Sequence, residues 1–582
     1  MLNTIDKNGY EEVTDNFAVE WNMVEGLTLR GQFGITHRNN QIDYFLPANH
    51  SWFTNEDNGN TYTTDEGLLR RGRYEYTTGK RDSYDANVTL AYSKTLNDLH
   101  SLYVGLDYSV SSGHSTSLKS IYERFAGGLL NFVGNAGGYE KDGMPVGNKS
   151  TNRRLGFTAN VNYTYDGRYY LDASARVDGS STFGSDKKYA PFWSVGFGWN
   201  LHNEQFMKDH DLFNNLRLKV SYGQTGTQQG SGSGAKTVYA YDLTNRYMNR
   251  TGVTLREWGN PRLTWQTTDE FNVGTEIGLW QGRVKAEFDF YTKKTSNLLS
   301  NMDLPLSMGR PSYTANVGEV KNRGWELSLR TYLIRDAKRE LNWMISGQLV
   351  YDKNWISKLS DAIKAQTEEY LKQNVEVANL FYEGNPQNAI YAVRSLGVDP
   401  STGREIFLNR NGERTEDWSA GDKMYLGSRD PLYRGNLNTM LMWKGWTLNV
   451  SFGYYWGGKV YNQTLIDRVE VTTSKLQTSN VDRRVYSDRW QKPGDVVFFK
   501  GFSNTATRAS SRFVMNDNVF QLQSASLQYR WDNDWVRRYT RAASITFGVN
   551  MSDLFHWSST RIERGIDYPF ARNIQGSIKI MF

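Results

Sequence analysis

Hydrophobic and polar side chains alternate strictly along several stretches of the chain. In residues 155–165 every second position is apolar or aromatic, while Gly, Thr and Asn fill the positions between. Alternation with a period of two is typical of a β-strand that has one apolar face. The same pattern recurs over residues 84–93, 102–110, 169–177, 216–223, 284–291, 446–456, 545–551 and 574–582. The pattern therefore predicts an all-β fold.

The length of the stripes separates a membrane barrel from a soluble β-protein. Residues 155–165 and 446–456 each alternate over eleven positions. An ordinary globular strand has about 5–6 residues, whereas a tilted strand needs about 9–11 to cross a bilayer. Aromatic residues close the apolar face at Tyr92, Tyr165 and Trp456, where a membrane barrel carries its interfacial girdles. The lengths favour a transmembrane antiparallel β-barrel. A soluble glycan-binding β-protein is an alternative, because a soluble sheet can also solvate charged faces.

Short and long connections alternate between the predicted strands. Short turns are expected at residues 24–26, 97–98, 166–167, 281–282 and 444–445. Long polar loops are expected at residues 46–80, 112–150, 224–260, 356–432 and 457–512. Outer-membrane barrels combine short periplasmic turns with long extracellular loops, so this rhythm supports the barrel.

The number of strands raises the question of completeness. Counting the alternating stretches gives roughly 17 spanning strands, the first at about residues 16–23. Bacterial barrels of this kind have an even number of strands. The first residues also lack the basic and apolar segments of a secretory signal peptide. We therefore expect the chain to be an N-terminally truncated piece of a longer protein.

Composition removes several other classes of protein. The 582 residues include no cysteine, which excludes disulfide scaffolds and Cys-ligated metal sites. No apolar run reaches the roughly 18 residues of a membrane-spanning helix. Aromatic residues make up 14% of the chain, which argues against disorder. A net charge of +6 is too weak at this length to indicate a nucleic-acid partner.

Six motifs, in order along the chain, resemble those of one transporter family. They are YLDASARVDGSSTFG at residues 170–184, PFWSVGFGW at 191–199, LKVSYGQTG at 218–226, NPRLTWQ at 260–266, NVGEVKNRGWEL at 316–327 and NMSDLF at 550–555. Together they resemble the SusC/RagA family of TonB-dependent outer-membrane transporters. Thr227 and Gln266 stand where that family usually has Asn and Glu. The terminal Phe582 matches the aromatic ending that the outer-membrane assembly machinery reads.

The resemblance implies a function as well as a fold. It implies a 22-stranded, plugged barrel in the cell outer membrane, surrounded by outer-membrane lipid. Such a barrel imports oligosaccharides or oligopeptides with a SusD-like surface lipoprotein as partner. The TonB complex would supply the energy through the plug. A passive outer-membrane porin or channel is a further alternative, against which an odd strand count argues.

The chain also departs from the family pattern at its start. We expect no signal peptide, no TonB box and no plug domain in it, and about 17 of the 22 strands. Residues 1–582 are thus expected to form a single N-terminally truncated TonB-dependent-receptor-like barrel domain.

Two groups of residues are candidates for contact with a substrate. Aromatic side chains in the long loops can stack on a substrate, although packing between loops is the stronger interpretation; they are Trp52, Trp258, Trp418 and Trp490. Polar positions of the strands are expected to face the lumen and to contact the plug or one another more often than cargo; they are Tyr103, Tyr170, Asp172, Arg176, Lys285, Glu287, Asp289 and Tyr291.

No pattern of catalytic or metal-binding residues emerges. The seven histidines include no HExxH pair, and the chain has no GxSxG elbow, Walker loop or EF-hand loop. Acidic loop residues could in principle form a carboxylate pair as in glycoside hydrolases, but hydrogen-bonding or solvated groups are the better interpretation; they are Asp399, Glu405, Glu413, Glu416 and Asp417. The protein is therefore expected to be no enzyme and to need neither cofactor nor metal, and a barrel-embedded hydrolase is disfavoured.

Overall fold

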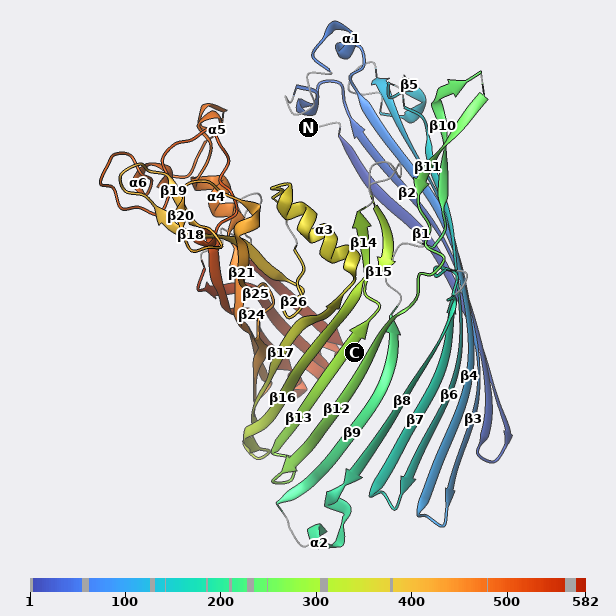
Figure 1. The fold of residues 1–582 in the computed structure, drawn as a ribbon. Helices are drawn as coiled ribbons and strands as arrows, with labels where there is room; N and C mark the ends of the chain where they lie inside the picture. The colour runs from blue at the N-terminus through green and yellow to red at the C-terminus, as the bar shows by residue number, and fades with distance from the viewer. Residues whose placement is uncertain are drawn as a thin grey trace. The chain divides into compact units, whose positions relative to one another are not determined.

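The computed structural model of the chain consists mainly of long antiparallel strands (Figure 1). It describes residues 4–54, 62–125, 131–141, 143–184, 187–208, 212–227, 235–248, 250–303, 312–376, 380–478, 480–560 and 572–582. The chain divides into two compact units. The first comprises Met1–Thr164, Asp172–Trp193 and Gly230–Trp265, and the second comprises Tyr165–Leu171, Ser194–Gln229 and Gln266–Phe582.

The first unit contains the N-terminal strands. They are β1 (Ile5–Val24), β2 (Leu27–Leu46), β3 (Arg73–Leu96), β4 (His100–Phe125), β5 (Ala136–Tyr139), β6 (Val146–Tyr165), and parts of β7 (Tyr169–Ser180) and β8 (Tyr189–Asn200). A separate hairpin pairs β10 (Val238–Tyr247) with β11 (Arg250–Glu257). Short helical turns lie between β2 and β3, at Ser51–Thr54 and in α1 (Asp65–Leu68). Aromatic contacts join the ends of these strands, since Phe45, Tyr74 and Phe125 form one buried cluster.

The second unit contains the remaining long strands. They are β9 (Phe213–Thr227), β12 (Gln266–Leu279), β13 (Val284–Ser296), β16 (Gly318–Asp336), β17 (Leu341–Leu359), β22 (Tyr433–Trp443), β23 (Trp446–Tyr461), β24 (Val514–Trp531), β25 (Ser544–Ser558) and β26 (Asn573–Met581). Each pairs antiparallel with the next along this series. Shorter elements are α2 (Gln205–Lys208), α7 (Asp534–Thr540) and the hairpin of β14 (Leu299–Asp303) with β15 (Ser312–Asn316).

The predicted strand count agrees with the sheet. Among the described residues eighteen strands belong to one sheet. One of them, β5, has four residues, and the other seventeen are the long strands that the alternation predicts. The first strand was placed too short, because β1 begins at Ile5 rather than near residue 16. Polar residues fill most of its first half, so alternation could not reveal that half.

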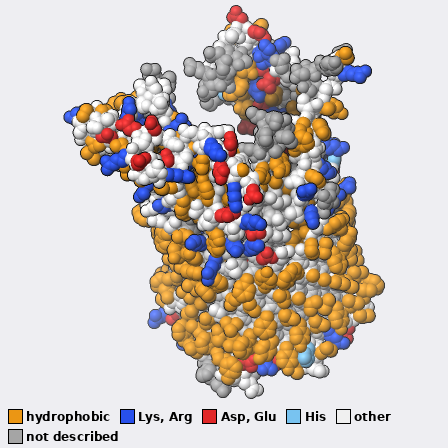
Figure 2. Space-filling model, viewed as in Figure 1, with side chains coloured by type: hydrophobic (Ala, Val, Ile, Leu, Met, Phe, Trp, Pro, Cys, Tyr) orange, Lys and Arg blue, Asp and Glu red, His pale blue; other side chains and the backbone are white. Residues whose placement is uncertain are grey.

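Alternating side chains give the sheet of the second unit two unlike faces. Phe288, Leu327 and Leu329 occupy adjacent strands on one face and are 41%, 37% and 45% exposed. Hydrophobic side chains gather in a band over the lower parts of β9, β12 and β13 (Figure 2). The opposite face carries charged and amide side chains. Large exposed apolar surface of this kind needs a partner that is itself apolar.

The expected turns are confirmed. Asp166 and Gly167 both have positive φ angles, 51° and 62°, as do Lys444 and Gly445, 45° and 84°. Positive φ at both central residues is the geometry of the hairpin turn whose twist matches the flanking strands. Short connections of this kind therefore fix the register of the long strands.

The expected long loops contain more structure than predicted. Strand β3 begins at Arg73 and β4 continues to Phe125, inside stretches expected to be loops. These extensions lack clean alternation, because buried polar residues such as Ser120 and Glu123 lie there beside the buried Tyr74 and Phe125. The hairpin of β10 and β11 lies in the predicted loop 224–260, of which residues 228–234 and 249 lie outside the described residues.

A small folded region, called here the loop module, occupies residues 380–428, 462–478 and 480–513. Its sheet has the order β20-β19-β18-β21. The strands are β18 (Ala389–Val398), β19 (Glu405–Leu408), β20 (Arg414–Thr415) and β21 (Lys423–Ser428), and the helices are α4 (Gln463–Val469), α5 (Thr473–Thr478) and α6 (Arg484–Ser487). Its core includes Val469, Val485 and Phe513, which are almost completely buried. The prediction of simple polar loops was wrong here.

A further helix covers the loop end of two strands. Helix α3 (Asp361–Lys372) starts after Ser360, whose hydroxyl accepts a hydrogen bond from the Ile363 amide at 3.4 Å. Ile363 packs into a buried cluster with Val320 and Ile356. None of the helices in the described ranges has the length and apolar character to cross a membrane.

Candidate functional site

Charged residues form a network on the polar face of β9, β12 and β13. The Lys219 ammonium lies 2.7 Å from a Glu287 oxygen, 3.1 Å from Asp289 and 3.8 Å from Glu276. One cation thus faces three carboxylates, and each side chain keeps some exposure to water. The Arg217 guanidinium also lies 3.8 Å from Glu276. The network therefore links strands through side chains in addition to the backbone ladder.

A glycine in the middle of the network leaves the space that its charged side chains need. Gly274 lies directly opposite both Lys219 and Asp289 in the strand register. A methyl group at Gly274 would overlap both of their side chains. The glycine therefore provides the space in which the cation and the carboxylate meet.

Two open cavities follow this polar face. One, of about 460 Å³, is lined by Glu276, Lys285 and Glu287 and by amide groups. The other, of about 530 Å³, is lined by Arg434, Gln521 and other polar residues. Gln348 and Asn436 line both. Amides and carboxylates at this density can exchange hydrogen bonds with sugar hydroxyls or with peptide groups.

The predicted lumen residues of β13 lie on this face. Lys285, Glu287 and Asp289 alternate along it, whereas Tyr291 is almost completely buried. The Tyr291 hydroxyl donates to Asp352 at 3.0 Å. Asp352 also accepts a hydrogen bond from the Asn322 amide at 3.2 Å. Tyr291 therefore joins three strands and is held in place rather than free to follow a substrate.

Tyr170, at the start of β7, belongs to the second unit. The Arg217 guanidinium lies 5.2 Å from the centre of its ring. The ring also occupies the space that a side chain at Gly198 would need. Tyr170 is thus packed between neighbouring strands.

The other predicted lumen residues belong to the first unit. Tyr103 lies over Gly105 beside Asn160 on β6. Asp172 accepts a hydrogen bond from the Asn162 amide. The Arg176 guanidinium donates to both oxygens of Asp178, at 2.7 and 2.8 Å. Asp172 and Arg176 therefore contact polar residues of the strands, and the role of all three residues toward cargo stays a prediction.

The loop tryptophans are held mainly by their own surroundings. Trp52 packs edge-on against Phe53 with ring centres 5.0 Å apart. The Trp418 indole donates to the Ala509 carbonyl, and the Trp490 indole donates to the Pro400 carbonyl, both at 2.9 Å.

Trp258 is half-buried just after β11. The hydrogen bonds of Trp418 and Trp490 are contacts between different loops, whereas Trp52 packs within its own loop. Stacking on a substrate stays a prediction for all four tryptophans.

A buried ionic cluster organises the loop module. Arg512 bridges Glu405 at 2.8 Å and Glu470, and the three side chains are 4%, 5% and 0% exposed. Ser510 donates to Glu405 at 2.6 Å, and Thr507 donates to Glu470 at 2.7 Å. Burial alone would raise the pKa of Glu470, but the Arg512 guanidinium outweighs it and holds that pKa below its usual range. The cluster ties together segments that are far apart in the chain.

Sequence reasoning missed this cluster. Glu405 was expected to be a hydrogen-bonding or solvated residue, and the solvated interpretation is wrong for it. Its partner Arg512 lies 107 positions later, so spacing held no signal. The cluster could have been predicted only if the burial of Glu405 had been known, and composition does not reveal burial.

The remaining acidic loop residues make local contacts. Asp399 accepts a hydrogen bond from the Ser401 amide at 2.8 Å, and Glu413 from the Asn409 side chain at 2.9 Å. Glu416 pairs with Arg404 at 2.9 Å. Asp417 follows them near β20. Asp399, Glu413 and Glu416 thus belong to turns and a surface ion pair.

The C-terminal strand ends in the predicted aromatic residue. Phe582 directly follows β26 and is 86% exposed. Such exposure leaves the side chain accessible to an assembly factor. Its role as an assembly signal stays a prediction.

Sequence comparison places this chain among large membrane receptors. Residues 4–472 match the family described as TonB dependent receptor-like, beta-barrel. TonB-dependent receptor P3 of Formosa agariphila is 27% identical over 599 residues, which cover 98% of this chain and 55% of that protein. TonB-dependent receptor SusC of Bacteroides thetaiotaomicron is 26% identical over 455 residues, which cover 74% and 44%. The chain spans about half the length of these curated relatives.

Solved structures share the fold. The RagAB peptide transporter aligns with a TM-score of 0.83 at 21% identity, over 96% of this chain and 59% of that one. The RagAB peptide importer in its open-open state aligns with a TM-score of 0.84 at 22% identity, over 100% and 62%. At this identity the likeness establishes the architecture.

Proposed function

This chain belongs to the family of TonB-dependent receptor-like β-barrels, and from that premise we propose that its protein imports oligosaccharides or oligopeptides. The resemblance carried by the six motifs is confirmed. Members of the family are outer-membrane barrels, so the predicted fold class and location in the cell outer membrane are confirmed too.

The observation that carries the proposal is the sheet with two unlike faces. Its apolar face suits lipid, because Phe288, Leu327 and Leu329 remain exposed on it. Its polar face carries the Lys219 network and the two cavities that share Gln348. Such a wall separates lipid from a wet passage, as barrel walls do.

Oligomeric substrates suit the chemistry of this wall. Hydroxyl-rich sugars and peptides both offer many donors and acceptors, and neither needs a deep apolar pocket. One relative carries the name SusC, and a structure with the same fold is titled a peptide transporter. These names support both substrate classes for this protein without choosing between them.

Two partners complete the proposal. The TonB complex supplies energy through a plug domain, and a SusD-like surface lipoprotein closes over the loops. The loop module is a suitable docking surface for such a partner, because its buried Arg512 cluster gives it a fixed shape. Import in this scheme needs no covalent chemistry and no cofactor, so the protein acts as a transporter and not as an enzyme.

Uptake by the host tests the proposal. The chromosomal gene is deleted, and entry of labelled oligosaccharides and oligopeptides of graded length is measured with and without a protonophore. We expect deletion to abolish uptake of one class of oligomer, and the protonophore to have the same effect. Unchanged uptake of both classes would refute the import function. Uptake that depends on the gene but is unchanged by the protonophore would support a passive channel instead.

A pair of variants tests the polar wall. Gln348→Trp places a large ring between the two cavities, whereas Leu349→Trp adds the same ring on the opposite face. We expect the first to reduce uptake several-fold at an unchanged level of protein in the membrane. Equal uptake by the two variants would show that this face does not line the path.

A further inference from the structure

Like charges lie directly opposite one another on the apolar face of β13, β16 and β17. In the strand register Arg323 pairs with Lys353, and Lys294 pairs with Lys321. Like charges in directly opposite positions destabilise a sheet. The two pairs lie next to each other on this face, and a bound anion would neutralise the repulsion within them.

Acidic side chains of the chain supply little of that neutralisation. Glu319 lies 3.4 Å from Lys294. Within the described part of the chain, no acidic group forms an ion pair with Arg323, Lys353 or Lys321. Glu383 forms an ion pair with Lys364 at 2.9 Å instead. The site therefore keeps a net positive charge.

The position of these cations along the strands is informative. A row of aromatic residues crosses the apolar face, two residues nearer the short turns than Arg323 and Lys353. Phe290 is opposite Trp325, Trp325 is opposite Tyr351, and Tyr351 is opposite Tyr433. The Trp325 and Tyr351 rings are 6.1 Å apart, and those of Tyr351 and Tyr433 are 5.2 Å apart.

This row marks the loop-side boundary of the membrane. Aromatic belts sit at the level of the lipid headgroups. Arg323 and Lys353 each lie two residues further toward the loops, about 7 Å along the strand. Above the hydrophobic band, charged side chains begin to appear on this face (Figure 2). The cations thus stand where the phosphates of outer-leaflet lipids lie.

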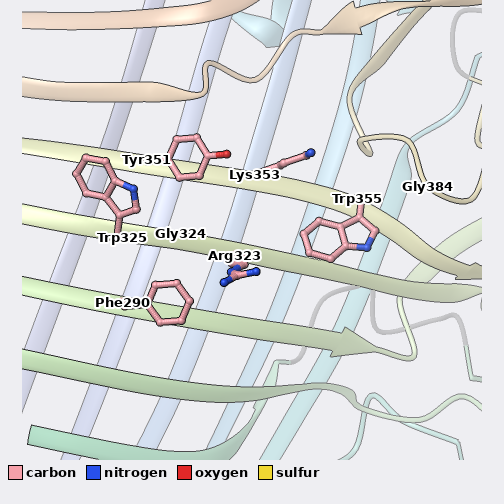
Figure 3. A pocket seen from close by; sticks show the side chains of 8 residues that line it. All are labelled: Phe290, Arg323, Gly324, Trp325, Tyr351, Lys353, Trp355 and Gly384. Atoms are coloured by element: carbon pink, nitrogen blue, oxygen red, sulfur yellow. The ribbon is translucent and has the colours of Figure 1, made fainter.

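An open cavity connects the aromatic row with the cations. Its volume is about 630 Å³, and it is lined by Phe290, Arg323, Gly324, Trp325, Tyr351, Lys353, Trp355 and Gly384. Arg323 lies between Phe290 and Trp355, with Lys353 on the next strand (Figure 3). The Arg323 guanidinium is 5.2 Å from the centre of the Phe290 ring. The cavity therefore has an apolar floor and a basic edge.

We propose that this cavity binds the phosphate-bearing headgroup of an outer-leaflet lipid. The phosphate bridges Arg323 and Lys353, since a guanidinium matches phosphate oxygens in a bidentate manner. The first atoms of the acyl chains lie over Phe290, Trp325 and Tyr351. A free phosphate ion would use the cations but not the aromatic floor, so the lipid is the occupant that fits both.

Binding of a defined lipid tests the proposal. The protein is purified from the outer membranes of its host as the unchanged form and as R323Q/K353Q, made in the chromosomal gene. Native mass spectrometry in detergent then measures binding of a monophosphorylated lipid A, of the same lipid without phosphate, and of inorganic phosphate. A matched control, K338Q/R339Q, removes two charges from the turn at the other end of the same hairpin. A charge-preserving variant, R323K/K353R, tests rescue.

The expected result is selective. The phosphorylated lipid binds the unchanged protein, the control and the rescue variant, and R323Q/K353Q weakens binding at least tenfold. Equal binding by R323Q/K353Q would overturn the proposal, and so would equal binding of the lipid without phosphate. Inorganic phosphate that binds as tightly as the lipid would make the site a free-anion site. A change in the number of protein subunits with unchanged lipid binding would make it a protein contact, which also overturns the proposal.

Discussion

Substituting Val450 by arginine should strongly destabilise the sheet in a membrane. In strand β23 (Trp446–Tyr461) the apolar stripe runs from Trp446 to Trp456, and both of these residues lie on the apolar face. Ten residues at about 3.3 Å each, tilted by about 40°, span about 25 Å, the height of the apolar band of a barrel. Val450 lies four residues from Trp446, which places it near the middle. An arginine at mid-bilayer on the lipid face costs about 2–4 kcal/mol.

The neighbouring residue provides a matched control. Asn449 points to the polar face and lies 3.5 Å from the Ser526 hydroxyl. Val450→Arg and Asn449→Arg add the same side chain one position apart on one strand. Guanidinium unfolding of the purified protein in phospholipid vesicles, followed by circular dichroism, measures the difference. We expect Val450→Arg to lower the folded-to-unfolded ratio by about 30-fold to several hundred-fold, and Asn449→Arg much less.

Equal destabilisation by the two variants would refute the reasoning. It would mean that neither face of β23 meets lipid, or that both do. A larger loss from Asn449→Arg would show that the two faces are assigned the wrong way round.

Three other predictions concern the loops and turns. Arg512→Ala leaves two buried carboxylates without a counter-charge, which costs about 3–5 kcal/mol; limited proteolysis should cut the loop module much faster than in the unchanged protein. Because the folded-state pKa of Glu470 is lowered, its stabilising contribution is complete above the ordinary carboxylate pKa of about 4.3 and is lost as the pH falls through the folded value. Protease resistance of the module should therefore stay constant from pH 7 to 5 and fall below that, as measured with an acid-active protease. Gly167→Val forces a β-branched residue to a φ of 62°, where an L-residue costs about 1–2 kcal/mol, and should lower the unfolding midpoint accordingly.

Each of these predictions has a control and a contrary outcome. Arg410 lies on the exposed surface of the same module, so Arg410→Ala should leave the rate of proteolysis unchanged. If Arg410→Ala and Arg512→Ala were cut equally fast, the buried ionic cluster would not be what stabilises the module. Resistance that falls already between pH 7 and 5 would contradict the lowered pKa. Gly31→Ala is the control for the turn, because Gly31 has open space around it and no positive φ. An equal fall of the unfolding midpoint in Gly31→Ala and Gly167→Val would contradict the argument that the positive φ of Gly167 causes the loss.

The spanning strands could be predicted because lipid on one face and polar groups on the other force strict alternation. The stripe of residues 446–456 lies within β23, and the expected turn at residues 444–445 precedes it. The ends of the strands could not be predicted, since β4 continues to Phe125 through a stretch in which buried polar residues such as Ser120 and Glu123 interrupt the alternation. Pattern therefore marks the membrane-facing part of each strand and not its full length.

The candidate site was predictable only in part. The alternation of Lys285, Glu287 and Asp289 assigned them to one face. It gave no sign that Lys219 would lie among three carboxylates, because that contact depends on register and on the space left by Gly274. The loop module stayed hidden for a similar reason, since its buried charges are joined only by the tertiary fold.

Spin-label accessibility along β13 tests the central claim most directly, that this sheet is a wall between lipid and a wet passage. The chain has no cysteine, so single cysteines can be placed at each position from 284 to 289 and labelled in lipid vesicles. The account predicts that labels at Val284, Ala286 and Phe288 relax with oxygen, which concentrates in lipid. Labels at residues 285, 287 and 289 should relax with a water-soluble nickel reagent instead. Accessibility without this period of two, or with the two faces exchanged, would contradict the account.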